Sequence, residues 1–188
     1  MTPGFPDAVA GAQSSFRALL DALARPGTRH RAGADLDPPA PLDRATAAVL
    51  LTLVDADSCL WLDPAFAAAA SWIAFHCGPR LTADLAAADF VVTPTLATLA
   101  TLATGTDEAP EDSATLILQL PGLDAGPELR LSGPGLRIPT ILQLGLPTGF
   151  ARAWAANHAL FPRGIDLILC AGSTLTALPR SLRVEETG

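Results

Sequence analysis

The spacing of apolar residues changes along the chain, and each change predicts a different element. Near the start, apolar side chains recur at intervals of three and four residues, which is typical of one face of an α-helix. Pro26 and Gly27 interrupt this spacing and predict the end of the helix. The expected face consists of Val9, Ala12, Phe16, Leu19 and Leu23.

Further helices are expected where apolar runs follow residues that favour a helix start. Asp43 is a candidate N-cap, and the second half of the helix after it is so apolar that it should be buried. Asp63 followed by Pro64 is typical of another helix start. Repeats of Leu-Ala-Thr before Gly105 predict a short helix. The expected helices cover 43–54, 64–77, 96–104 and 147–160.

Short apolar runs bounded by turn residues predict strands between these helices. The expected strands cover 59–62, 90–92, 114–120, 128–132, 165–170, 175–178 and 182–185, with one short strand between Thr28 and Pro41. Turns at 121–127 and at Gly172 predict antiparallel hairpins on either side of them. Helices between successive strands indicate the α/β class, as a helix/sheet sandwich with a mixed sheet. The length of 188 residues suits a single domain over 1–188.

The apolar run that ends at Cys170 predicts a strand buried on both faces. Asp166 is the exception within it, and a carboxylate there needs a cation or backbone N–H groups. Alternation along a strand puts Ile165, Leu167 and Leu169 on one face, and Asp166 with Ile168 and Cys170 on the other. Arg180, which follows the next strand, is the favoured cation. Two roles are open to Asp166, namely a structural ion pair or contact with a ligand.

The composition and net charge of the chain argue against several classes of function. The net charge of −7 argues against nucleic-acid binding, and no apolar run is long enough to span a membrane. Met1 to Asp7 lacks the features of a signal peptide, so a cytoplasmic protein is expected. All 12 cations are arginines, which excludes a lysine Schiff base with pyridoxal phosphate. The three cysteines are far apart, so no metal site is expected.

Several short motifs follow one another in a specific order along the chain. They are Ser15-Phe16-Arg17-Ala18-Leu19-Leu20 with Pro26-Gly27, Val49-Leu50-Leu51-Thr52-Leu53 before Trp61-Leu62, Phe75-His76, Gly105-Thr106 with Ala109-Pro110-Glu111, Ala114 to Gln119, Phe161-Pro162-Arg163-Gly164-Ile165-Asp166, and Leu178-Pro179-Arg180 with Val184-Glu185. Together these motifs resemble the PhnH family, the H subunit of the bacterial carbon-phosphorus lyase system. The resemblance runs in register over nearly the whole chain.

The resemblance implies a cytoplasmic subunit that works with the G, I and J subunits in phosphonate catabolism. That system attaches an alkylphosphonate to the ribose of ATP with loss of adenine, giving ribose 1-phosphonate 5-triphosphate. The resemblance also implies a fold similar to pyridoxal-phosphate-dependent transferases, without the cofactor. No catalytic residue is implied, and the candidate pocket residues are Arg17, His76, Glu111, Asp166 and Arg180. Cys77 and the proline-rich stretch near Pro38 depart from the family pattern.

The leading hypothesis is a homodimeric, non-catalytic subunit that stabilises the complex or binds a nucleotide or phosphonate through arginines. The alternative is a subunit that contributes acid/base residues, with His76 or Glu111 in that role. A free-standing enzyme acting on a small molecule is the third hypothesis. Whether the subunit has enzymatic activity of its own is left open by the sequence.

Overall fold

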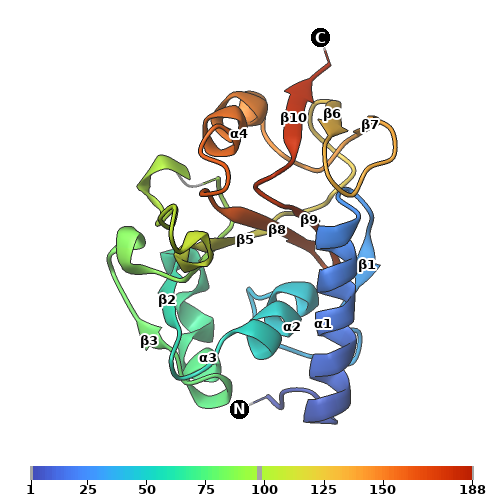
Figure 1. Ribbon diagram of the computed structural model, residues 1–188. Helices are drawn as coiled ribbons and strands as arrows, with labels where there is room; N and C mark the ends of the chain where they lie inside the picture. Colours follow the sequence, from blue (N-terminus) through green and yellow to red (C-terminus); the bar gives the residue numbers. More distant parts are fainter. Residues whose placement is uncertain (1, 97–98, 188) are drawn as a thin grey trace.

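The computed structural model describes residues 2–96 and 99–187, and it is built around a seven-stranded mixed sheet. The strands lie in the order β1-β9-β8-β5-β4-β2-β3 (Figure 1). Strands β3, β2, β4, β5 and β8 are parallel to one another, whereas β9 runs antiparallel to both of its neighbours, β8 and β1. Their bounds are β1 His30–Arg31, β2 Cys59–Leu62, β3 Arg80–Leu81, β4 Phe90–Thr93, β5 Thr115–Gln119, β8 Asp166–Ala171 and β9 Thr174–Leu178.

Two apolar cores cover the two faces of this sheet, which confirms the expected α/β sandwich. Helices α1 (Ala8–Ala24), α2 (Arg44–Leu53) and α3 (Ala70–His76) contribute to the first core. Helix α4 (Phe150–His158) and a second, smaller sheet contribute to the other. Figure 1 shows α4 and the small sheet on the opposite side of the main sheet from α1 and α2.

Strand β8 separates the two cores as its alternation predicted. Ile168 and Cys170 belong to the core beneath α1 and α2, and Leu167 and Leu169 belong to the core beneath α4. All four are buried, and β5 and β9 occupy the two edges of the strand. Asp166, the first residue of β8, is the one charged residue in it.

The predicted hairpin between 114–120 and 128–132 is wrong. Both edges of β5 are occupied by the parallel strands β4 and β8, so β5 has no free edge for an antiparallel partner. Strand β6 (Leu129–Ser132) instead lies in the small sheet between β10 (Arg183–Glu186) and β7 (Thr140–Leu142). The hairpin at Gly172 between β8 and β9 is confirmed.

Helix α1 forms where the spacing predicted it, but only part of the predicted face is buried. Ser15, Leu19 and Ala22 face the core, while Val9 is 68% exposed and Phe16 is 45% exposed. The helix packs against α2 and β9, where small side chains allow close contact. The apolar face that the sequence predicted for α1 therefore lies only partly within the contact with α2 and β9.

Helix α2 begins after Asp43, as predicted, but the side chain of Asp43 caps nothing in its own helix. Its Oδ2 accepts a hydrogen bond from the N–H of Gly172 at 2.8 Å, so it ties the helix start to the β8–β9 turn. Burial also begins earlier than predicted, because the helix is buried from Ala45 to Leu50. The carboxylate therefore serves tertiary structure rather than local capping.

Several loops contain short 3-10 helices. Asp63 accepts from the N–H of Ala65, as expected of an N-cap, but the first segment after it is the 3-10 helix η1 (Pro64–Ala69), and α3 follows directly. The predicted short helix over 96–104 lies partly outside the described residues, and Leu99–Thr101 forms the 3-10 helix η3. The others are η2 (Leu85–Ala87) and η4 (Pro110–Asp112). Within the described residues, no helix is long and apolar enough to cross a membrane.

Candidate functional site

Asp166 and Arg180 form an ion pair at the amino end of β8, as the sequence predicted. The Nη2 of Arg180 lies 2.6 Å from Oδ2 of Asp166, and the backbone N–H of Arg180 donates to Oδ1 at 2.8 Å. Arg180 follows β9, and the antiparallel pairing of β9 with β8 brings it back beside Asp166. The tertiary fold thus provides both a cation and a backbone donor for the carboxylate.

The remaining donors of Arg180 extend this site to a third segment. Its Nη1 donates to the carbonyl oxygen of Pro110 at 2.6 Å, in the 3-10 helix that also contains Glu111. The side chains of Arg180 and Asp166 are 16% and 26% exposed, so the pair is mostly removed from water. Asp166, Arg180 and the segment of Glu111 are therefore brought together by the fold. An arginine that is held by both a carboxylate and a carbonyl has few donors left for a ligand.

Glu111 itself lines a shallow acidic pocket of about 340 Å3 at the amino ends of the parallel strands. Asp55, Asp57, Asp89 and Asp112 line the same pocket. Hydrogen bonds from the Ser58 side chain and from nearby backbone N–H groups lower the pKa of Asp55, so this carboxylate stays ionised. Excess negative charge makes this pocket unsuitable for a phosphate or phosphonate group.

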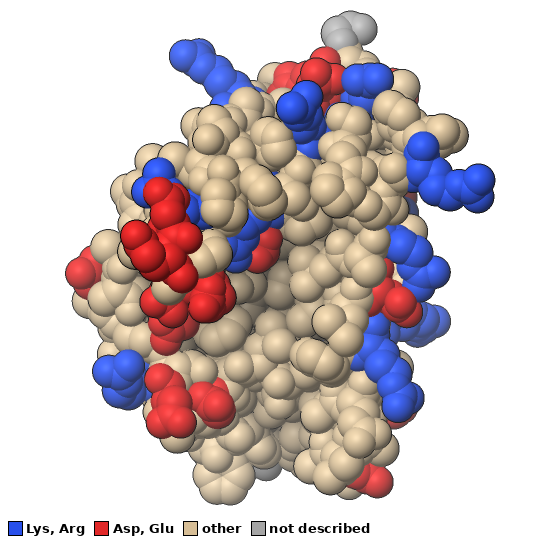
Figure 2. Space-filling view, in the orientation of Figure 1, with Lys and Arg blue, Asp and Glu red and all other residues tan. Residues whose placement is uncertain are grey.

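The acidic side chains are visible as a group on one face of the molecule. Figure 2 shows carboxylates gathered beside a shallow hollow, with arginines along the opposite edge. Carboxylates that line the acidic pocket also make structural hydrogen bonds; the Oδ2 of Asp89, for example, accepts from the N–H of Cys59 at 2.7 Å. Among the described residues, no three His, Cys, Asp or Glu side chains are placed to hold a metal ion.

His76 lies at the end of α3, away from the Asp166–Arg180 pair. Its Nε2 is 3.2 Å from the carbonyl oxygen of Thr2, which can only accept, so Nε2 carries the proton. The ring also contacts Trp72 and Phe75. These contacts are those of a histidine that fastens the N-terminal segment to α3.

Arg17 lies exposed on α1, and among the described residues its side chain makes no hydrogen bond or ion pair. The pairing of Arg17 with Asp21 that the helical spacing allows is not made. Asp21 instead pairs with Arg25 at 2.7 Å, one turn later on the helix. Arg17 therefore does not complete a pocket with the other four candidates.

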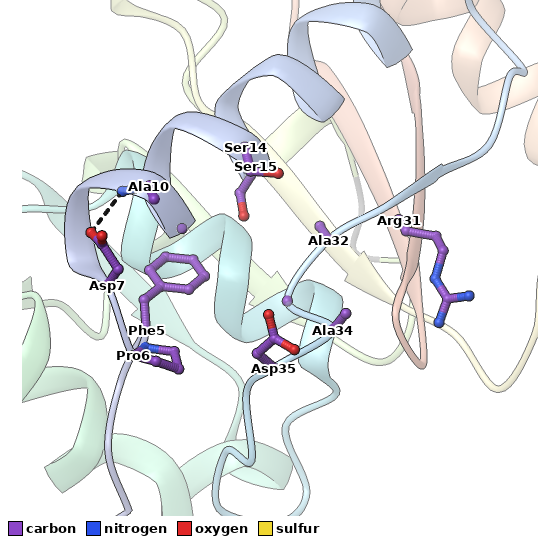
Figure 3. A pocket seen from close by; sticks show the side chains of 12 residues that line it. Phe5, Pro6, Asp7, Ala10, Ser14, Ser15, Arg31, Ala32, Ala34 and Asp35 are labelled. Atoms are coloured by element: carbon purple, nitrogen blue, oxygen red, sulfur yellow. Dashed lines mark hydrogen bonds between the residues drawn. The ribbon is translucent and has the colours of Figure 1, made fainter.

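A further cavity of about 430 Å3 lies between the start of α1 and the segment after β1 (Figure 3). Phe5 and Ser15 line it on the α1 side, and Asp35 lines it on the other. The side chain of Asp7 is occupied at the helix start, where it accepts from the N–H groups of Val9 and Ala10. In Figure 3 the guanidinium of Arg31 extends away from the centre of this cavity. None of the five candidate residues lines it.

Comparison with known proteins identifies the family. Residues 3–185 match the model of PhnH, described as a bacterial phosphonate metabolism protein. The chain is 42% identical over 187 residues to the alpha-D-ribose 1-methylphosphonate 5-triphosphate synthase subunit PhnH of Rhizobium meliloti, covering 96% of this chain and 94% of that protein. It is 35% identical over 182 residues to the putative C-P lyase subunit protein HtxG of Stutzerimonas stutzeri, covering 94% of this chain and 87% of that protein. The chain therefore belongs to the PhnH family of bacterial phosphonate metabolism proteins.

Proposed function

We propose that this chain is a non-catalytic subunit of a carbon-phosphorus lyase complex, in which it supports the attachment of an alkylphosphonate to the ribose of ATP. The observation that carries the proposal is the match to the PhnH family over residues 3–185. The names of both relatives, a synthase subunit and a putative C-P lyase subunit, point to a role within a larger assembly.

The geometry of the candidate residues supports a role without chemistry of its own. Asp166 and Arg180 satisfy one another, and Arg180 is held further by the carbonyl of Pro110. General acid/base catalysis needs a titratable group within reach of a reacting proton and free to exchange it. The ion pair offers no such group, which favours a structural role for Asp166.

The alternative is that the chain contributes acid/base residues to the transferase reaction, and Glu111 is the better placed of the two candidates. Glu111 is exposed beside an open pocket, whereas His76 donates its Nε2 proton to the carbonyl of Thr2. A partner subunit would have to bring the substrate to Glu111, because the surrounding carboxylates repel anions.

Association with further chains is part of the proposal. Val9, Phe16 and Leu20 are exposed on one face of α1, next to Arg17, and apolar surface of this kind favours contact with a partner. We propose a homodimer in the isolated state, with the G, I and J subunits as partners in the complex. Three cysteines without disulfides support the cytoplasm as its location. The net charge of −7 argues against a nucleic-acid partner, and the lack of lysine argues against a pyridoxal-phosphate cofactor.

The test compares the purified chain with the complex reconstituted from it and the G, I and J subunits. Release of adenine from ATP in the presence of methylphosphonate is followed by chromatography. We expect product only from the complex that contains this chain, and an unchanged rate when Glu111→Gln or His76→Gln replaces the natural chain. Product from the chain alone would overturn the proposal. A large loss of rate in either variant, with assembly intact, would favour the alternative.

The proposed dimer is tested by light scattering coupled to size-exclusion chromatography. Phe16→Gln, which replaces an exposed ring on α1, should shift the mass toward the monomer, and Phe75→Gln serves as a control because Phe75 is 71% exposed on a different helix. A mass that is monomeric at all concentrations would contradict the dimer.

A further inference from the structure

A pocket of about 480 Å3 lies between the end of α4 and the small sheet, away from the five candidate residues. Strand β10 pairs with β6 so that Arg183 stands opposite Ser132, and directly opposed residues present their side chains on the same face of a sheet. Ser181 lies two residues before Arg183, and α4 supplies His158 at its last turn. Three elements therefore place polar side chains around one cavity.

His158 fixes the orientation of Arg183. The Nδ1 of His158 is 3.1 Å from the carbonyl oxygen of Arg180, and because a carbonyl only accepts, Nδ1 carries the proton. Its Nε2 is then the acceptor for the Nε–H of Arg183 at 3.3 Å. This bond occupies Nε and leaves the two Nη groups of the guanidinium available to an acceptor.

The donors of this pocket have no competing acid. Among the described residues, Arg183 has no carboxylate within ion-pair distance, and the hydroxyls of Ser132 and Ser181 have no hydrogen-bond partner. No Asp or Glu lines the pocket. Glu185, two residues after Arg183 on β10, is held by Nη1 of Arg130 at 2.8 Å. In a chain of net charge −7, a pocket with an unopposed arginine and no carboxylate is unusual enough to indicate a preference for anions.

Phe161 adds an apolar wall. It lines the same pocket, is 58% exposed, and its backbone N–H donates to the carbonyl of His158 at 3.1 Å. An aromatic ring left this exposed beside an arginine can stack on a planar or apolar part of a ligand. The cavity is also larger than a single oxyanion requires, which leaves room for an organic group.

We propose that this pocket binds a phosphate-type oxyanion. The Nη groups of Arg183 would bind two of its oxygens, the hydroxyls of Ser132 and Ser181 would donate to the others, and Phe161 would contact the organic part of the ligand. Arginine suits this role because its planar donors match a phosphate or phosphonate group bidentately. The proposal rests on the geometry of the pocket and holds whether or not the proposed function of the subunit is correct.

The experiment is a titration of the isotope-labelled chain followed by nuclear magnetic resonance at constant ionic strength. Inorganic phosphate, methylphosphonate and ATP are each added in separate titrations, up to about 10 mM, because weak sites have millimolar affinity. We expect saturable shifts of the backbone amides of Ser132, Ser181 and Arg183 with at least one of the three. Binding of phosphate as strong as that of ATP would indicate a site for the oxyanion alone.

Two variants and a control make the test specific. Arg183→Gln should weaken binding by about tenfold or more, since it removes a charge-assisted bidentate contact. Phe161→Ala should weaken ATP and leave phosphate unchanged if the ring contacts the base. Arg152→Gln, a change of the same kind at an exposed arginine outside the pocket, should have no effect. Thermal melting of each variant verifies that it is folded.

Either of two results would overturn the proposal. One is the absence of saturable shifts at the three amides with all three anions. The other is equal binding by the natural chain and a folded Arg183→Gln variant, which would place the anion elsewhere.

Discussion

Removal of the Asp166 carboxylate tests how the fold tolerates a charge at the mouth of a buried strand. In Asp166→Ala, Arg180 loses the partner of its Nε and Nη2 groups and the acceptor of its backbone N–H. The guanidinium keeps only the carbonyl of Pro110. It cannot turn freely into water, because its side chain is 16% exposed.

The expected cost lies between two known limits. Breaking a fully buried pair costs about 3–5 kcal/mol, whereas an exposed pair contributes less than about 1 kcal/mol. Since the two side chains are 16% and 26% exposed, we expect Asp166→Ala to reduce the free energy of unfolding by about 2–3 kcal/mol. For a chain of this size that lowers Tm by roughly 4–12 °C.

Two companion variants identify the cause. Asp166→Asn keeps an oxygen that can accept from the N–H of Arg180 and loses only the charge, so it should cost about half as much. Asp107→Ala breaks an ion pair with Arg163 in which Asp107 is 75% exposed, and should cost less than about 0.5 kcal/mol. Denaturant and thermal unfolding measure all three. If Asp166→Ala and Asp166→Asn were as stable as the natural chain, the structural role of the pair would be refuted.

Three further predictions concern groups outside the ion pair. Pyridoxal phosphate should form no aldimine absorbance that survives desalting, because the chain has no lysine and only the terminal amine could react; a retained band with mass on a side chain would contradict this. Burial raises the pKa of Cys77 to about 11 and of Cys170 to about 12, so native thiols should resist a disulfide reagent at pH 8 and react once unfolded. Because an unfolded thiol ionises near pH 9, the stability from these two groups should fall as the pH rises from about 9 toward 12; an unchanged unfolding curve would argue against it. Gly145→Ala would place a Cβ 2.1 Å from the carbonyl oxygen of Gly122. In Gly172→Ala, φ is also positive but the space is open, so only a backbone strain of roughly 1–2 kcal/mol is expected, and Gly145→Ala should destabilise the chain several times more. Equal melting temperatures of the two variants would refute the steric reason.

The parts of the fold that the sequence predicted are those in which neighbours along the chain decide the structure. The β8–β9 hairpin follows from two apolar runs joined by a turn at Gly172. The small sheet could not be predicted in this way, because β6 pairs with β10, more than 50 residues later in the chain. The predicted hairpin paired β6 with β5, because the sequence does not show that β4 and β8 occupy both edges of β5.

The buried face of α1 shows a second limit. Val9 and Phe16 belong to the apolar stripe in the sequence but are exposed, whereas Ser15 and Ala22 face the core together with Leu19. An alanine-rich helix offers several faces of similar hydrophobicity, and the shape of α2 and β9 selects among them. Size matters more than polarity at such a contact, so a serine can be buried while a phenylalanine remains exposed.

The candidate residues divide for a related reason. Arg180 could be assigned to Asp166 because the hairpin returns the chain to its starting edge and arginine is the only strong cation available. Nothing in the sequence indicates the carbonyl of Pro110 as the third member, since backbone groups carry no signature of their own. Arg183 was missed for the same cause, because its partner His158 reaches it through the packing of α4 on β10.

The two ends of β8 therefore have similar chemistry and little capacity for ligands. At its amino end, Asp166 is neutralised by Arg180, and at its carboxyl end the N–H of Gly172 is held by Asp43. Open α/β sheets usually bind ligands beyond the carboxyl ends of their strands, yet here Asp43 and the end of β8 are tied to one another. Arg183 on β10 and Ser132 on β6, which have no acidic partner among the described residues, lie between α4 and the small sheet. For binding of an anion, Arg183 is therefore better placed than Arg180, and exchange of each arginine for glutamine should separate the two roles. Arg180→Gln should lower the stability but keep anion binding at temperatures where the variant is folded. Arg183→Gln should weaken anion binding but keep the stability. The opposite outcome would show that the central strand, and not the small sheet, carries the ligand.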